Sequence, residues 1–401
     1  MKIRPFWVLL HRYVGLTMTV FLIIVGFTGS LLAFYAELEN SLNPQLSVPS
    51  ESREPLDFAV LLDNAQRAAP EAVPESVWLS PNAARVSVYP QYGSTAKQAK
   101  VLDYNQLILN PYTGEALGRR HWGAISQGLG ELMPFIYQLH YSLALGSTGI
   151  WILGITALVW SLDCFVGFYL TLPASRRNQA DYPKRSFWQR WRVAWQVKFT
   201  ASTYRVNFDL HRAGGLWLWL VLLIFAWSSV AMNLTDSVYS KVTQTVFELH
   251  QPWSDIADLP EPLVNPAINW REAERLGREA LAQAAMIQGF SIEAPVSMWL
   301  NRKKGFYVYM VRSSLDFQDK SGQTRVVIDA NSGEQKMLLL PQGQYSGNTL
   351  TAWLMALHMA NVFGLPYRIF VCLLGLAIVM LAVTGVVIWL KKRRVRVGRK
   401  I

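Results

Sequence analysis

Two similar hexapeptides contain the residues best suited to chemistry in this chain. His11 to Leu16 reads HRYVGL, and His211 to Leu216 reads HRAGGL. In each copy a His precedes a Gly (Gly15 or Gly215) by four residues, so the two residues share one face of a helix. Glycine leaves bare backbone beside the imidazole, with room for a large flat group. This spacing predicts half of a haem site, present twice in the chain.

Two more histidines complete the pattern. His140 and His358 each lie in an apolar helical stretch that breaks just before a long apolar run. Membrane thickness excludes pairing within one half of the chain, so the pairs must come from opposite halves. Each pair could hold one iron from both sides, which gives two sites, one near each membrane face.

A haem suits two imidazoles better than a bare metal ion does. A structural zinc takes four protein ligands and a catalytic zinc takes three, whereas haem needs only axial groups from the protein. Arg12 and Arg212 directly follow the first two histidines and could bind the propionates as a fork. The two cysteines, Cys164 and Cys372, lie in apolar runs and the chain has no C-x-x-C-H sequence, so the haem would be bound non-covalently.

Three other polar residues are weaker candidates. Asp163 lies inside an apolar run, where an acidic residue is costly and is therefore a functional candidate. It would handle protons or tune the nearer haem, or else form a structural hydrogen bond to a neighbouring helix. His121 and His250 have no counterpart in the other half. We interpret both as surface residues, with contact to substrate or substitution as a ligand as the alternative.

The composition is that of a membrane protein, with 51% hydrophobic and 16% charged residues. Apolar runs long enough to cross a bilayer cover about 14–36, 148–172, 213–234 and 367–390. Half of the 38 Lys and Arg residues fall near the N-terminus, in 176–212 and in the tail from Lys391. This clustering indicates topology rather than a nucleic-acid surface, and it places both termini and the central loop in the cytoplasm. The first run is too long for a signal peptide, so we expect an uncleaved helix.

The two long segments between these runs resemble each other. Each begins with a helical stretch, 56–69 or 269–285, and Asn269 with Glu272 indicates a helix start. Alternating strands follow, and each set ends in a similar turn, at 110–115 and 329–334, whose Gly supplies a positive φ. The strands are expected at 77–79, 85–89, 101–109, 296–300, 305–311 and 325–329.

The sequence therefore predicts a membrane α-helical protein with four transmembrane helices in two pseudo-symmetric repeats and two periplasmic α+β modules. In the central loop, Trp188, Trp191, Trp195 and Phe199 recur at helical spacing among basic residues, which indicates an amphipathic membrane anchor or a docking surface for an electron donor. The expected order is a first transmembrane helix (1–36), a module (37–127), a His helix with the second transmembrane helix (128–172), a basic loop (173–210), the third transmembrane helix (211–235), a module (236–347), a His helix with the fourth transmembrane helix (348–390) and a basic tail (391–401).

Three motifs together carry a family resemblance. They are His-Arg-x-x-Gly-Leu before a span, the D/N-x-x-[ST]-G-E turn, and Leu-His in an apolar helix before a span. In this order and duplicated, they resemble the PepSY-associated transmembrane proteins over nearly the whole chain, and in particular their ferrioxamine-reductase-like, iron-regulated inner-membrane members. The resemblance implies haem b, two per chain, held by His11, His211, His140 and His358, and reduction of a ferric siderophore at the periplasmic face.

No cytoplasmic segment is long enough for a flavin or nicotinamide domain, so electrons must come from an unidentified cytoplasmic partner or from membrane quinol. Two other classes stay open. A membrane-anchored PepSY binding or regulatory module would be colourless, with dispensable histidines. A siderophore or metal permease would have broken helices at mid-membrane lined by polar groups.

Overall fold

The computed structural model describes residues 3–90, 102–174 and 186–397. The chain forms two compact units. We call Met1–Phe34, Ile136–Val242 and Leu357–Ile401 the helical unit, and Tyr35–Phe135 and Thr243–Ala356 the sheet unit. The helices are α1 (Ile3–Leu32), α2 (Tyr35–Leu42), α3 (Phe58–Ala68), α4 (Leu132–Ser142), α5 (Gly146–Thr171), α6 (Phe187–Trp191), α7 (Thr203–Trp217), α8 (Trp219–Asn233), α9 (Ser240–Thr243), α10 (Trp270–Gln288), α11 (Ser346–His358) and α12 (Gly364–Val397).

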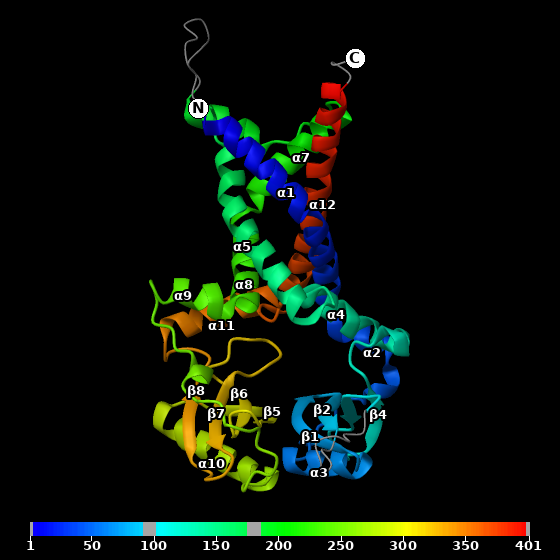
Figure 1. The fold of residues 1–401 in the computed structure, drawn as a ribbon, viewed down its shortest axis with the longest axis vertical. Helices are drawn as coiled ribbons and strands as arrows, with labels where there is room; N and C mark the ends of the chain where they lie inside the picture. The colour runs from blue at the N-terminus through cyan, green and yellow to red at the C-terminus, as the bar shows by residue number, and fades with distance from the viewer. Residues whose placement is uncertain (1–2, 91–101, 175–185, 398–401) are drawn as a thin grey trace, which may run out of the picture. The chain divides into compact units, whose positions relative to one another are not determined.

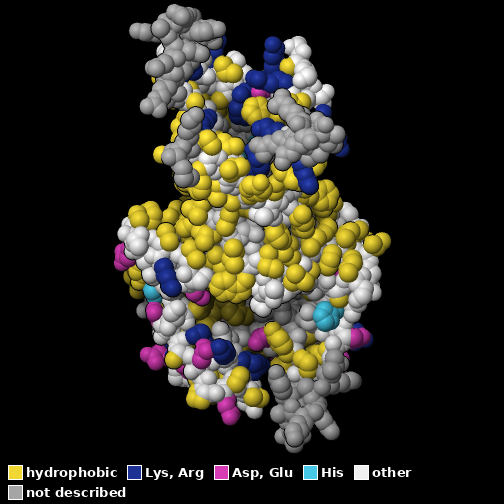
Figure 2. Space-filling model, turned by 45° about the horizontal axis from the view of Figure 1, so that its top comes forward, with side chains coloured by type: hydrophobic (Ala, Val, Ile, Leu, Met, Phe, Trp, Pro, Cys, Tyr) yellow, Lys and Arg dark blue, Asp and Glu magenta, His cyan; other side chains and the backbone are white. Residues whose placement is uncertain are grey.

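The helical unit contains the membrane spans. Among the described residues, α1, α5 and α12 are long and apolar enough to cross a bilayer, and the bent pair α7–α8 brings the number of spans to as many as four. Large hydrophobic side chains such as Trp151, Phe165 and Leu373 are exposed on these helices, and Figure 2 shows such surface in yellow. Helix α1 begins and α12 ends at the same end of this unit (Figure 1).

The third predicted span differs from a single helix. Helices α7 and α8 meet at an angle of 69°, around Leu218. Two features explain the bend. The adjacent Gly214 and Gly215 weaken the helix at this point, and the Trp217 indole donates a 3.1 Å hydrogen bond to the Trp195 carbonyl of the central loop.

The central loop is less helical than its spacing predicts. Helix α6 ends at Trp191, and one 3-10 turn, Arg192–Trp195, follows it. The predicted amphipathic helix through Phe199 is therefore wrong beyond Trp195. The physical reason is competition for backbone carbonyls, because side chains of α7 take the carbonyls of Val193 and Trp195 that a longer helix would use.

Small residues allow the spans to approach closely. Helices α1 and α12 cross where a Cβ added to Gly26 would lie 2.8 Å from the Gly375 carbonyl oxygen. Ser30 of α1 donates a 2.8 Å hydrogen bond to the carbonyl of Cys372 in α12. Close packing of this kind replaces the hydrophobic driving force that is missing between helices in lipid.

Both His helices end in strained backbone, at the breaks expected from the sequence. After α4, Leu143 and Ala144 have φ of 53° and 54°, and after α11, Ala360 and Phe363 have φ of 49° and 60°. A non-glycine residue in this region costs about 1–3 kcal/mol, and such strain gathers at functional sites.

The sheet unit contains one sheet. In the described residues it is eight-stranded and antiparallel throughout, in the order β4-β3-β2-β1-β5-β6-β7-β8 (Figure 1). Each half of the chain supplies a four-stranded meander, and pairing of β1 with β5 joins the two meanders. The strands are β1 (Ala72–Ser80), β2 (Ala83–Pro90), β3 (Gln106–Leu109), β4 (Ala116–Arg120), β5 (Ile292–Asn301), β6 (Phe306–Ser313), β7 (Thr324–Asp329) and β8 (Gln335–Leu339).

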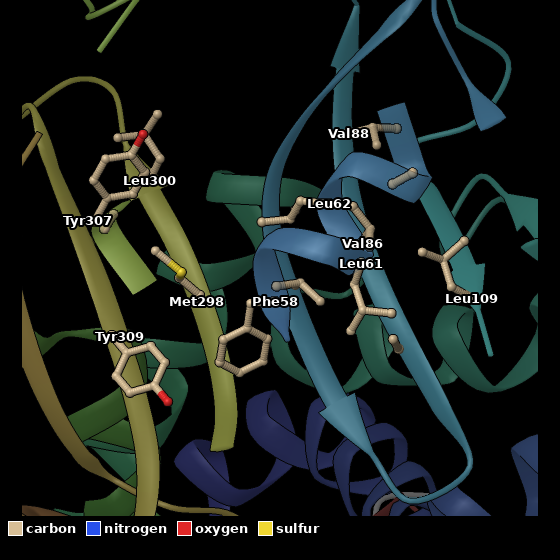
Figure 3. Close-up of a cluster of buried hydrophobic side chains, with 14 of the residues drawn as sticks. Phe58, Leu61, Leu62, Val86, Val88, Leu109, Met298, Leu300, Tyr307 and Tyr309 are labelled. Carbon is tan, nitrogen blue, oxygen red and sulfur yellow. The ribbon is translucent and has the colours of Figure 1, made fainter. Parts of the chain in front are cut away.

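The two meanders share a hydrophobic core beneath α3 and α10. Figure 3 shows Phe58 and Leu61 of α3 on one side of this core and Met298 and Tyr309 of the second meander on the other. A buried carboxylate also links the halves, because Glu274 of α10 accepts hydrogen bonds from the first two backbone N–H groups of α3, at 3.1 and 2.8 Å. The meanders are therefore joined by strand pairing, by packing and by a helix cap.

Local signals in the sheet unit formed as the sequence predicts. Asn269 caps α10 by accepting a 2.9 Å hydrogen bond from the Glu272 N–H. Gly114 and Gly333 have φ of 75° and 76° in the two matching turns. The predicted strand 101–109 begins at a residue outside the described ones, and its described strand starts at Gln106.

Candidate functional site

The helical unit brings four histidines together in two pairs. In the first pair, His11 of α1 and His211 of α7 have ring centroids 6.1 Å apart. In the second pair, His140 of α4 and His358 of α11 have centroids 6.2 Å apart. These are the pairs expected from opposite halves of the chain. Their role as ligands stays a prediction.

In the first pair, each Nδ1 is held by a neighbouring helix. His11 Nδ1 lies 3.0 and 2.9 Å from the two carboxylate oxygens of Asp163 in α5. His211 Nδ1 lies 3.0 Å from the Leu381 carbonyl oxygen and 3.1 Å from the Thr384 hydroxyl, both in α12. The Thr384 hydroxyl donates its own proton to the Met380 carbonyl. Every partner is thus a hydrogen-bond acceptor.

The second pair has the same arrangement with hydroxyl partners. His140 Nδ1 lies 2.9 Å from the Thr28 hydroxyl, and His358 Nδ1 lies 2.7 Å from the Ser228 hydroxyl. Both hydroxyls donate their protons to carbonyls of their own helices, so they accept from the imidazoles. These contacts assign the proton of each histidine to Nδ1, which leaves Nε2 with the lone pair that a metal ligand needs.

The separation of the rings matches two imidazoles bound to opposite sides of one metal ion. A metal–nitrogen bond of about 2.0–2.1 Å on each side, with about 1.1 Å from nitrogen to ring centre, places the centroids about 6 Å apart. Among the described residues, no three His, Cys, Asp or Glu side chains gather to hold a bare ion. Two imidazoles alone suit a haem, which fills the remaining iron positions itself.

Glycines lie beside the histidine pairs, and they differ in the space that a side chain would find there. A Cβ added at Gly15 or Gly215 would meet nothing within 4 Å, so the space that the His-x-x-x-Gly spacing predicts is open. In contrast, a Cβ added at Gly29 would lie 3.1 Å from His140, and one at Gly385 would lie 3.2 Å from His211. Sequence reasoning missed these two glycines, which give the imidazoles room against the neighbouring helix.

The two arginines predicted to meet propionates differ from each other. Arg212 donates a 2.7 Å hydrogen bond to the Val193 carbonyl and pairs with Asp209 at 2.8 Å, so it anchors the central loop to α7. Arg12 is half-buried and forms no hydrogen bond or ion pair with the described residues, which leaves its guanidinium free for an anionic group.

Three charged side chains are buried among the described residues of the helical unit: Asp209, which pairs with Arg212, Asp163 and Arg368. Asp163 is 9% exposed and has the partner described above, which settles its orientation toward His11. Arg368, near the start of α12, is 8% exposed and donates a 2.9 Å hydrogen bond to the Ala33 carbonyl. Its guanidinium also lies over the Phe34 ring. Sequence reasoning missed Arg368, although a lone Arg at the start of an apolar run is a usable signal.

The other two histidines lie in the sheet unit. His121 is exposed. His250 Nε2 pairs with Asp255 at 2.6 Å, and its ring lies 4.9 Å from that of Tyr345. Neither residue joins a histidine pair.

The chain matches a known family over almost all of its length. The profile described as the PepSY-associated TM region matches residues 8–392. This range includes both histidine pairs and both meanders of the sheet. No curated protein matches the chain significantly. The chain therefore belongs to the PepSY-associated TM region family, as its motifs indicate.

Proposed function

We propose that this protein is a haem b-containing reductase of the bacterial inner membrane that passes electrons to a ferric siderophore, ferrioxamine-like in class, in the periplasm. The observation that carries the proposal is the geometry of the two histidine pairs. In each pair the ring centroids lie about 6 Å apart, and each Nδ1 lies within hydrogen-bond distance of an oxygen on another helix. A haem held at each pair supplies one-electron oxidation and reduction.

The residues of the chain hold and orient the two groups. In each pair the acceptor on the neighbouring helix fixes the ring and its tautomer, and it makes Nε2 more basic. The strained breaks after α4 and α11 hold His140 and His358 at the ends of their helices. Arg12, which is half-buried, is a cation of the helical unit that could balance a propionate.

The path of the electrons follows from the proposed topology. Clustered Lys and Arg residues near both chain ends and in the central loop support a cytoplasmic location for the first pair. The second pair would then lie toward the periplasm. Electrons would enter from quinol or a cytoplasmic partner near His11 and His211 and leave near His140 and His358. Reduction to ferrous iron weakens the hold of a siderophore and releases the metal.

The test is direct oxidation of the reduced protein by substrate. Detergent-purified protein, reduced with dithionite and freed of excess reductant without oxygen, is mixed with ferrioxamine in the presence of a ferrous chelator. We expect the reduced haem band to disappear as the ferrous chelate forms, and His358→Ala to stop both changes. A reduced haem that ferrioxamine leaves unchanged would refute the reductase.

The bend in the third span favours one alternative. Broken helices are typical of transporters, and α7–α8 is bent by 69°. A siderophore or metal permease would move its substrate across proteoliposomes with no change in oxidation state. A PepSY binding module without redox activity would bind no haem at all. The reductase explains four matched histidines, and neither alternative does.

A further inference from the structure

A cavity lies on the face of the sheet opposite α3 and α10. Successive side chains of a strand point to opposite faces. Val77 and Met298 point into the core under the helices, so their neighbours Trp78 and Trp299 point the other way. The cavity has a volume of about 400 Å³ and is lined by Trp78, Trp253, Trp299, Asn301, Phe306 and Arg325.

Two parallel aromatic pairs form its walls. Trp78 and Trp299 have ring centroids 5.9 Å apart and planes within 7°. Trp253 and Phe306 have centroids 5.5 Å apart and planes within 12°. The first pair spans the junction of β1 with β5, so the wall exists only because the two meanders form one sheet. Trp78 is 44% exposed.

Two polar residues of this face, Arg325 and Ser297, lack an ion pair or a hydrogen bond, respectively, in the described part of the chain. Arg325 donates hydrogen bonds to Gln323 and, among the described residues, forms no ion pair. Burial lowers the pKa of Arg325, and the nearby charge of Asp316 opposes this shift. Ser297 stands opposite Trp78 in the register and is fully buried. In the described part of the chain its hydroxyl has no hydrogen-bond partner.

We propose that this cavity binds a planar, conjugated, anionic oxygen-donor group, the catecholate arm of a ferric chelate. The inference rests on the proposed function for a ferric siderophore as the substrate, and it adds catecholates to the hydroxamate class named there. Flat conjugated rings stack on tryptophan faces, and guanidinium binds two adjacent anionic oxygens as a fork. A neutral sugar could also stack on these rings, but it would offer the Arg325 guanidinium no anionic oxygen. The volume is at the lower end of small-molecule sites, about 300–1,000 Å³, which suits one arm.

The test uses a metal complex that cannot be reduced under the assay conditions. Isothermal titration calorimetry measures binding of gallium(III) tris-catecholate to the full-length protein in detergent. We expect saturable binding, weakened about tenfold or more by Trp78→Ala and by Arg325→Gln. Thermal melting checks that each variant is folded. Trp151→Ala and Arg271→Gln, exposed residues elsewhere, are the matched controls and should bind as the wild type does.

Several results would overturn the proposal. They are unchanged affinity in the folded Trp78→Ala and Arg325→Gln variants, no binding by the wild type at millimolar probe, or displacement of the probe by maltotriose. Because gallium binding requires no electron, it is independent of haem. A protein without haem that still binds the probe would refute the reductase and retain this site.

Discussion

With haem bound at both histidine pairs as proposed, removing the charge of Asp163 should change the redox potential of one haem and leave the other unchanged. The Asp163 carboxylate lies 2.9 Å from His11 Nδ1, and the hydroxyls of Thr28 and Ser228 take its place at the second pair. Asp163→Asn keeps an oxygen that accepts the Nδ1 proton, so the ring orientation is preserved. The change is therefore one of charge.

The size of the effect can be estimated from Coulomb's law. The carboxylate charge lies about 7 Å from a metal bound at Nε2, where one unit charge at an effective dielectric constant of about 20 is worth about 2.4 kcal/mol. For a single electron, this corresponds to about 100 mV. A negative charge stabilises the ferric state, so the substitution should raise the midpoint potential. The wild-type asymmetry would favour electron flow from the first pair to the second.

The assay is a spectroelectrochemical titration of the purified protein. Two midpoints are expected for the wild type, and Asp163→Asn should shift only the lower one upward, by up to about 100 mV. Thr28→Val is the matched control at the second pair and should change the other midpoint by less, because it removes no charge. Equal shifts of both midpoints, or none, would refute the reasoning.

Three further predictions follow from the structure. Gly15→Leu and Gly215→Leu fill open space beside the first pair, so haem content should fall by about one per chain while circular dichroism stays unchanged. Glu274→Ala leaves two N–H groups of α3 without an acceptor, which should lower the free energy of unfolding of the sheet unit by about 2–4 kcal/mol. Glu274→Gln should lower it less, and hydrogen exchange in β1 and β5 measures both changes. Despite burial, the Lys336 hydrogen bond and two backbone N–H groups lower the pKa of Asp329 to about 2. Its stabilisation is present above the unfolded pKa of about 4 and is lost as the pH falls toward 2. The melting temperature of the wild type should therefore exceed that of Asp329→Asn at pH 5 and converge with it at low pH.

Much of the site could be predicted because its signals are local. The four-residue spacing of His11 and Gly15, its repetition at His211, and the His helices before breaks are all readable from the sequence. The Asn269 cap and the two glycine turns likewise depend on residues a few positions apart. Such signals predict elements and their order well.

Long-range contacts could not be predicted in this way. Pairing of β1 with β5 joins segments more than 200 residues apart in the chain. The acceptors of Nδ1, such as Thr28 and Ser228, are common helix residues whose partner becomes apparent only when helices pack. The same holds for Arg120, which is buried between Glu39 and Glu131. The bend at Leu218 depends on the loop carbonyls that α7 contacts.

Electron paramagnetic resonance of the oxidised protein is the most direct test of paired axial histidines. Two low-spin ferric signals are expected, one for each pair, with a haem content of two per chain. Replacing His211 with Ala should convert the low-spin signal of the first pair to a high-spin signal or abolish it. Replacing His140 with Ala should do the same to the signal of the second pair. A protein with only high-spin signals, or one that takes up no haem, would contradict the account.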